Sequence, residues 1–100
     1  MDFTVIWSNR AIADLEGAIE YLESAAPASI SKFEREVVTT LERVRTNPYL
    51  GSKHEKITSG RVREVYCHPY RIIYRVSPSR STVELITLWH SARDEPDLFH

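Results

Sequence analysis

Chemically active side chains gather in the second half of the sequence. They are His68, His90, Tyr66, Tyr70, Arg61, Arg63 and Arg71. Cleavage of RNA through its 2′-hydroxyl needs a group that accepts that proton, a group that protonates the leaving 5′-oxygen, and cations that stabilise the pentavalent phosphate. The histidines could move protons, the tyrosines could donate one, and an arginine fork matches two phosphate oxygens. If the protein is a nuclease, the candidate catalytic residues are therefore Arg61, Arg63 and His90.

These residue types do not by themselves assign any catalytic residue. Four histidines and five tyrosines in 100 residues would offer some such combination in many unrelated proteins. Tyr70 and Tyr74 fall on alternate positions of a predicted strand, and we expect them in the core. His90 and Arg93 follow the last predicted strand, where they could contact a target or form a hydrogen-bonded corner with Asp94. Both roles stay open.

The charge of the chain is nearly balanced overall but uneven along its length. The formal net charge of -1 argues against a protein that coats nucleic acid through bulk positive charge. Between Lys53 and Arg80, seven basic residues stand against two acidic ones, so this segment could face an anion. The same residues could instead be the solvated outer positions of strands, where Arg and Lys discourage edge-to-edge pairing.

Hydrophobic spacing predicts one strand and two helices in the first half of the chain. The strand spans Phe3 to Trp7, and Ser8 or Asn9 can cap the helix that follows. That helix has an apolar stripe at Ile12, Leu15, Ile19 and Leu22, and an acidic face, expected in solvent, at Asp14, Glu16, Glu20 and Glu23. A second helix starts near Pro27 and ends at Asn47-Pro48. Its apolar positions are Ile30, Phe33, Val37, Leu41 and Val44.

The second half is predicted to be a loop followed by three strands. The segment from Gly51 to Gly60 is polar without a sustained period, which indicates the loop. The strands run from Arg61 to Cys67, from Tyr70 to Val76 and from Thr82 to Trp89, and their short connections make them antiparallel neighbours. The element order predicts a single α+β domain over residues 1–100, with a helical hairpin packed on one twisted sheet made of the first strand and this three-stranded antiparallel meander. The tail from Asp94 to His100 is expected to be only partly ordered.

Several classes of protein are disfavoured by what the sequence lacks. A single cysteine, Cys67, excludes an internal disulfide framework, and no thiolate cluster or histidine spacing indicates a metal site. We expect Cys67 to be a packed small side chain rather than a reactive thiol. No export signal is evident, and no apolar run approaches the ~20 residues that cross a bilayer. The expectation is a cytoplasmic protein without membrane, metal or cofactor.

Motifs along nearly the whole chain share a pattern with one protein family. They are Ile6-Trp7-Ser8, Ala11, Asp14-Leu15, Tyr21-Leu22, Phe33, Leu41, Asn47-Pro48-Tyr49-Leu50-Gly51, Arg63-Glu64-Val65, the strand from Pro69 to Val76, and His90-Ser91-Ala92-Arg93-Asp94. No single motif is diagnostic, but in this order within 100 residues they resemble the RelE/ParE superfamily of bacterial toxins. The resemblance implies the RelE/ParE-like fold.

The resemblance also implies a toxin of a type II toxin-antitoxin module, silenced by a small antitoxin that wraps around it in a hetero-oligomer. RelE-like members cut messenger RNA in the ribosomal decoding site, whereas ParE-like members block DNA gyrase and so stop replication. RelE-like nucleases tend to be strongly basic and to end in a Lys/Arg cluster or a His-Tyr pair. This nearly neutral chain instead runs into His90 and Arg93, an ending similar to the ParE branch. A toxin that blocks gyrase is therefore favoured.

Two alternatives to a gyrase inhibitor remain. One is a ribosome-dependent messenger RNA endoribonuclease, and the other is an inactive relative that retains antitoxin binding. The residues expected to contact the target or the antitoxin are Arg63, Arg71, Arg75, His90 and Arg93. The sequence leaves open which face of the sheet is exposed. The strand from Arg61 to Cys67 has apolar residues at both odd and even positions, so alternation does not distinguish its two faces.

Overall fold

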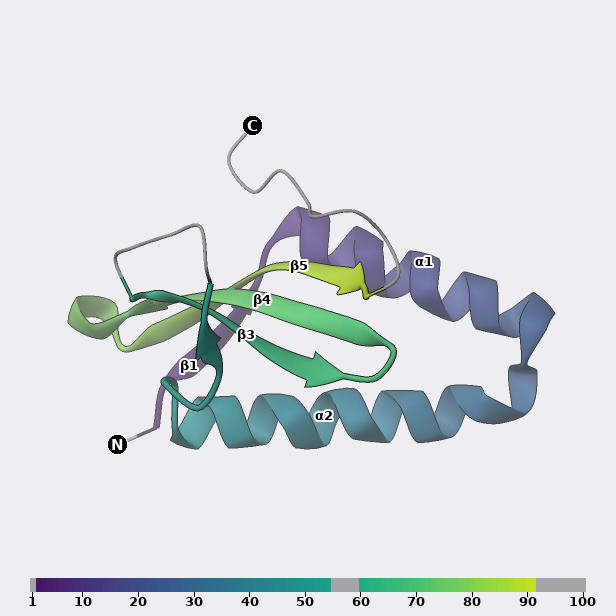
Figure 1. Cartoon of the computed structure of the whole chain (residues 1–100), viewed down its shortest axis with the longest axis horizontal. Helices are drawn as coiled ribbons and strands as arrows, with labels where there is room; N and C mark the ends of the chain where they lie inside the picture. The colour runs from purple at the N-terminus through teal and green to yellow at the C-terminus, as the bar shows by residue number, and fades with distance from the viewer. Residues whose placement is uncertain (1, 55–59, 92–100) are drawn as a thin grey trace.

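A computed structural model describes residues 2–54 and 60–91 of the chain. The elements are β1 (Thr4–Trp7), α1 (Asn9–Ala25), the 3-10 turn η1 (Pro27–Ser29), α2 (Ile30–Thr46), β2 (Ser52–Lys53), β3 (Val62–Cys67), β4 (Tyr70–Ser77), the 3-10 turn η2 (Pro78–Arg80) and β5 (Thr82–His90). All five strands join one sheet in the order β1-β5-β4-β3-β2. α1 lies against β5, and α2 lies against β3 and β1 (Figure 1). The predicted α+β fold with a helical hairpin on a sheet is confirmed.

The sheet contains two features that the sequence pattern did not predict. β2 lies inside the predicted loop, where Ser52 pairs with Glu64 and Lys53 pairs with Arg63. β1 pairs with β5 in parallel, because α1 and α2 carry the chain away from β1 before the antiparallel strands form. The antiparallel part of the sheet therefore has four strands rather than the expected three. Residues 55–59 of the predicted loop and the predicted tail from Asp94 to His100 lie outside the described residues.

The two helices bury their apolar stripes to different extents. In α2, Phe33, Val37 and Val44 are buried as predicted. In α1, Leu15, Ile19 and Leu22 of the predicted stripe pack against the core, together with the buried Ala11 and Ala18, whereas Ile12 is 43% exposed. The side of α1 that carries Ala11 and Ala18 lies against β5, and Asp14, which lies between them in the sequence, reaches the backbone of that strand.

Cross-strand partners sort the strand residues onto two faces. Side chains directly opposite each other in a sheet share a face. Tyr70, Ile72, Tyr74 and Val76 of β4 belong to the core between sheet and helices, whereas the residues between them point to the opposite side, here called the outer face. Register on the outer face places Tyr66 opposite Arg71 and Val62 opposite Arg75. None of the helices among the described residues is long and apolar enough to span a membrane.

Candidate functional site

Arg63 points to the helix-covered side of the sheet and is tied to the segment that follows α2. Its Nε donates to the carbonyl of Gly60 at 2.9 Å, and its Nη1 donates to the carbonyl of Gly51 at 3.1 Å. The guanidinium also lies 5.0 Å above the centre of the Tyr49 ring. Arg63 thereby joins β3 to the backbone of Gly51 and Gly60. A phosphate would have to compete with the two carbonyls for the same donors.

Tyr74 of β4 binds the segment that follows α2 through its side-chain hydroxyl. Its buried hydroxyl donates to the carbonyl of Pro48 at 2.7 Å and accepts from the backbone N–H of Gly51 at 3.0 Å. Burial raises the pKa of Tyr74, while the hydrogen bond from Gly51 and the charge of Arg63 act in the opposite direction. The phenol therefore stays neutral and keeps the proton that it donates. The expectation that Tyr74 is a core residue is confirmed, and Tyr70 is half-buried in the same core.

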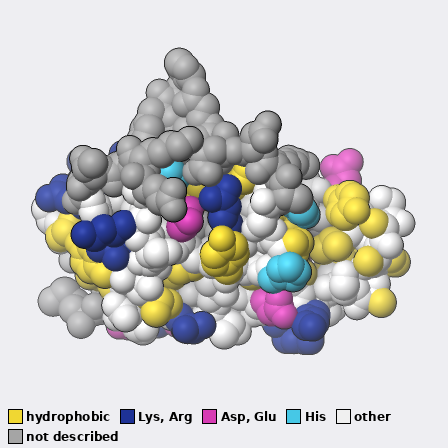
Figure 2. Space-filling view, in the orientation of Figure 1, with side chains coloured by type: hydrophobic (Ala, Val, Ile, Leu, Met, Phe, Trp, Pro, Cys, Tyr) yellow, Lys and Arg dark blue, Asp and Glu magenta, His cyan; other side chains and the backbone are white. Residues whose placement is uncertain are grey.

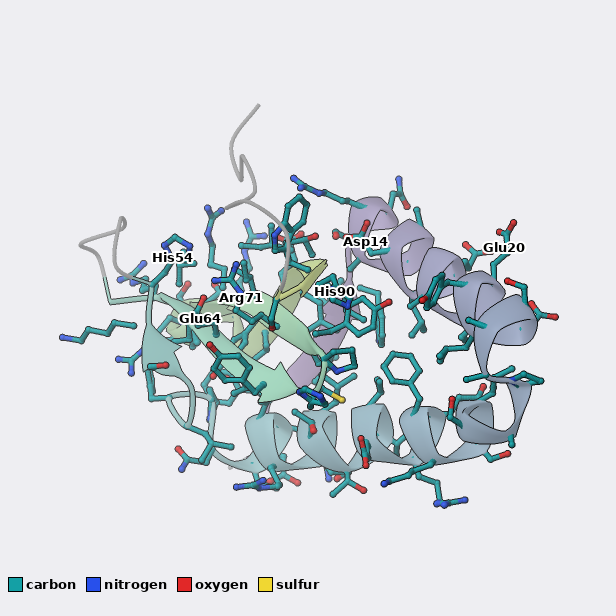
Figure 3. All side chains as sticks on the ribbon, turned by 45° about the vertical axis from the view of Figure 1, so that its right-hand side comes forward. Asp14, Glu20, His54, Glu64, Arg71 and His90 are labelled. Atoms are coloured by element: carbon teal, nitrogen blue, oxygen red, sulfur yellow. The ribbon has the colours of Figure 1, made fainter. Side chains whose placement is uncertain are left out.

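The outer face holds Arg71 and Arg75. Arg71 Nη1 lies 3.4 Å from Glu64 Oε2, and both side chains are largely buried, with 13% and 18% of their surface exposed. Figure 3 shows Glu64 and Arg71 beside each other on the sheet. Arg75 is exposed, opposite Val62 on β3 and Glu84 on β5. In Figure 2, Lys and Arg side chains occupy separate places on the visible surface rather than one continuous patch.

His90 ends β5 near the opposite end of the sheet from Arg63. Its ring packs edge-on against Tyr70, with centroids 5.3 Å apart, and Tyr70 in turn packs against Phe33 of α2. His90 borders a cavity of about 250 Å³ that opens between α1, α2 and the turn after β3. Arg93, its expected companion, lies outside the described residues, as does Asp94.

The candidate catalytic residues do not converge on one point. Arg63 is opposite Tyr74, and His90 is opposite Tyr70, four residues away along β4 and two strands from Arg63. At about 3.3 Å per residue and 4.8 Å per strand, their backbones are roughly 13 Å apart along the strands and roughly 10 Å apart across them. Arg61 directly precedes β3, at the end of that strand where Arg63 lies. One scissile phosphate would not reach both His90 and the arginines.

Asp14 has a role that the sequence pattern did not predict. It was expected on the solvated acidic face of α1, but its carboxylate accepts hydrogen bonds from the Thr87 hydroxyl and, at 3.2 Å, from the backbone N–H of Leu88. Ser8, the N-cap of α1, adds a bond from its hydroxyl to the carbonyl of Ile86 at 3.0 Å. These bonds join α1 to the part of β5 that extends beyond β1. Glu20, by contrast, points away from the sheet (Figure 3).

Cys67 is buried against α2, as expected for a packed small side chain. Burial raises the pKa of its thiol, a hydrogen bond with Thr40 lowers it, and the charge of Glu36 raises it again. A raised pKa leaves little thiolate at neutral pH, which disfavours nucleophilic chemistry. Within residues 2–54 and 60–91, no group of three or more metal-ligating side chains comes together.

Comparison with known families identifies the fold and the class of protein. Residues 5–95 match the family described as the ParE toxin of the type II toxin-antitoxin system parDE. The chain belongs to the ParE toxin family. A comparison with curated proteins gave no significant match.

Solved structures of RelE and ParE toxins share the fold of this ParE-family toxin. The chromosomal ParDE toxin-antitoxin system of P. aeruginosa is 18% identical, with a TM-score of 0.65, and the match covers 88% of this chain and 95% of that one. A mutant of the E. coli toxin RelE in the free state is 15% identical, with a TM-score of 0.63 and coverage of 92% and 86%. The archaeal RelE-RelB complex from Pyrococcus horikoshii is 17% identical, with a TM-score of 0.61 and coverage of 93% and 99%. At these identities the likeness extends to the fold alone.

A second opening of the ParE-family toxin lies between its two helices. This α1–α2 groove has a volume of about 350 Å³ and a mainly apolar lining. The residues that line it include Val5, Trp7, Leu15, Ile19, Val37, Val38 and Leu41. Val38 is 62% exposed at its edge, and Glu34, Glu42 and Arg45 form its charged rim.

The sequence contained a signal for one contact in the toxin that we did not predict. The two-residue turn His68-Pro69 places Cys67 opposite Tyr70, and that register sets Tyr66 opposite Arg71 and Glu64 next to the same arginine. Counting back from the turn would have indicated the ion pair between Glu64 and Arg71. No local pattern indicated the bonds of Arg63 and Asp14, because their partners lie on other elements.

Proposed function

We propose that this ParE-family toxin arrests growth by binding DNA gyrase, and that a cognate antitoxin neutralises it. The observation that carries the proposal is the separation of the candidate catalytic residues. Arg63 is bound to loop carbonyls, Arg71 is paired with Glu64, and His90 packs against Tyr70 at the far end of the sheet. An inhibitor that acts by contact needs no convergent acid, base and phosphate clamp, so this arrangement is compatible with binding.

The direct test is a supercoiling assay with purified components. Toxin in stoichiometric excess over gyrase is expected to abolish supercoiling of relaxed plasmid, and added antitoxin is expected to restore it. Relaxation by a type I topoisomerase is the matched control, which the toxin should leave unchanged. Normal supercoiling at this excess would contradict the proposal.

A second candidate activity, ribosome-dependent cleavage of messenger RNA, is favoured by one observation. The outer face brings together the phenol of Tyr66, the guanidinium of Arg71 and the carboxylate of Glu64, which are groups that metal-free RNA cleavage uses. Labelled thymidine and methionine incorporation after induction separates the two activities. The gyrase proposal expects thymidine incorporation to fall first and transcripts to remain intact. Early loss of methionine incorporation with cut transcripts would replace it, and unimpaired growth with soluble protein would indicate an inactive relative.

The α1–α2 groove supports the antitoxin part of the proposal. Its apolar floor and charged rim fit an amphipathic helix that lays its apolar face between α1 and α2. Val38→Glu would place a charge where that apolar face must lie, and we expect roughly tenfold weaker antitoxin binding. Val38 is exposed, so the fold should tolerate the change. Co-expression with the neighbouring gene product followed by titration measures the effect.

The matched control for the groove is Ile12→Glu, which introduces the same charge at an exposed apolar residue of α1 that does not line the groove. Antitoxin affinity should be unchanged in this variant. Equal affinity for the Val38→Glu variant and the wild type would place the antitoxin elsewhere.

A further inference from the structure

A polar groove lies between α2 and the end of β3, separate from the α1–α2 groove. It has a volume of about 510 Å³ and is open to solvent along one side. The residues that line it are Lys32, Arg35, Glu36, Thr39 and Thr40 from α2, and Tyr66, Cys67 and His68 from the end of β3 and the turn. On α2, positions 32, 35 and 39 and positions 32, 36 and 40 are three or four residues apart, so these residues form two adjacent rows on one side of the helix. Two cations, one carboxylate, two hydroxyls and the exposed Tyr66 ring thus border a single groove.

Tyr66 is the most unusual member of this groove. Its side chain is 66% exposed, more than any other large hydrophobic residue in the described part of the chain. A ring so exposed contributes little to the core, so packing does not explain it. Tyr66 has Arg71 opposite it on β4 and the groove residues of α2 on its other side.

The charges around the groove favour an anion, but only weakly. Arg35 is exposed and lines the groove, as does Lys32, whose Nζ lies 4.0 Å from Glu36. That pair is largely solvated, so the ion pair offsets the lysine only in part. The hydroxyls of Thr39 and Thr40 can add hydrogen bonds to phosphate oxygens. A ligand of this groove therefore carries few negative charges at any one point and has a flat group that can stack.

We propose that the groove between α2 and β3 binds one strand of nucleic acid, with a base stacked on Tyr66 and an adjacent phosphate held by Arg35. Single strands are recognised by this combination of aromatic platforms and cationic grooves, since every base has a π-face. A duplex hides its bases, so the exposed ring selects a single strand. The proposal goes beyond gyrase inhibition and does not depend on it, because it rests only on the residues of this groove.

Fluorescence anisotropy with ten-nucleotide oligo-dT and oligo-U at low salt tests the proposal on the full chain. Tyr66→Ala is expected to weaken binding on the order of tenfold, because stacking on one aromatic ring contributes about that much. Tyr66→Phe should retain binding, since the ring and not the hydroxyl is needed. Arg35→Glu should weaken binding and reduce its dependence on salt, because one phosphate contact is lost.

Two matched controls separate this groove from general surface charge. Tyr21→Ala removes an equally accessible tyrosine, 64% exposed, from α1, and Arg80→Glu reverses an exposed charge in η2. Arg80→Glu has the same effect on net charge as Arg35→Glu. Affinity in both controls should equal that of the wild type. Absence of binding, or equal losses in the control and groove variants, would overturn the proposal. Binding of either strand supports it, and the preferred strand identifies DNA or RNA as the ligand.

Discussion

Gly51→Ala should lower the free energy of unfolding by about 3 kcal/mol. A Cβ at this position would lie 2.6 Å from the carbonyl oxygen of Glu64 and 2.8 Å from the hydroxyl of Tyr74. Neither atom can retreat easily, because the first belongs to the backbone of β3 and the second is hydrogen-bonded to Pro48. The segment after α2 must therefore move away from the sheet and lose its bonds. Urea denaturation followed by circular dichroism measures the loss.

A matched glycine and a matched hydroxyl deletion make this prediction sharper. Gly17 lies in α1, and a Cβ added there would meet no neighbouring atom within 4 Å, so Gly17→Ala should leave stability unchanged or raise it by up to about 1 kcal/mol. Tyr74→Phe removes the hydroxyl without a clash and should cost about 1–2 kcal/mol. Wild-type stability in the Gly51→Ala variant would show that residues 48–51 are not held against the sheet.

Asp14→Ala should lower the free energy of unfolding by about 2 kcal/mol. The carboxylate accepts from both the hydroxyl of Thr87 and the N–H of Leu88, and Thr87 is fully buried. Removal of the acceptor leaves buried donors without their partner, which costs more than the bond itself contributes. We expect the loss to appear in thermal and in urea unfolding.

A double-mutant cycle distinguishes this bond from a general effect on helix α1. Asp14→Ala and Thr87→Val together should cost less than the sum of the single changes, because each alone already removes the shared bond. Glu20→Ala, an exposed acidic residue of the same helix, should change stability by less than about 0.5 kcal/mol. If the losses of stability caused by Asp14→Ala and Thr87→Val are strictly additive, the two residues do not share a stabilising hydrogen bond, and the role assigned to Asp14 is wrong.

The consequence of these two ties for a toxin is a fixed framework around both grooves. Asp14 and Ser8 hold α1 on β5, and Arg63 with Tyr74 holds the chain that follows α2. We therefore expect the helices to keep their places when a partner binds between them. Binding of a partner in the α1–α2 groove then costs the toxin less conformational entropy than it would if the helices were mobile.

The family and most of the elements followed from the sequence alone. Local periodicity determines where α2 and the strands β3, β4 and β5 form, because burial of one face requires apolar residues at regular spacing. The observed ends of these elements differ from the predicted ones by at most three residues. The motifs in their order along the chain were enough to indicate the RelE/ParE superfamily, and the family match confirms it.

The roles of individual polar residues depended on tertiary structure. The sequence could not place Arg63 beside the carbonyls of Gly51 and Gly60, nor Asp14 beside β5, because no local pattern encodes how these segments lie relative to one another. β2 escaped prediction for the same reason, since two polar residues form a strand only when β3 offers its edge. Hydrophobic spacing thus determines which segments become helices and strands. Which polar side chains are left to meet a partner is decided only when those segments pack together.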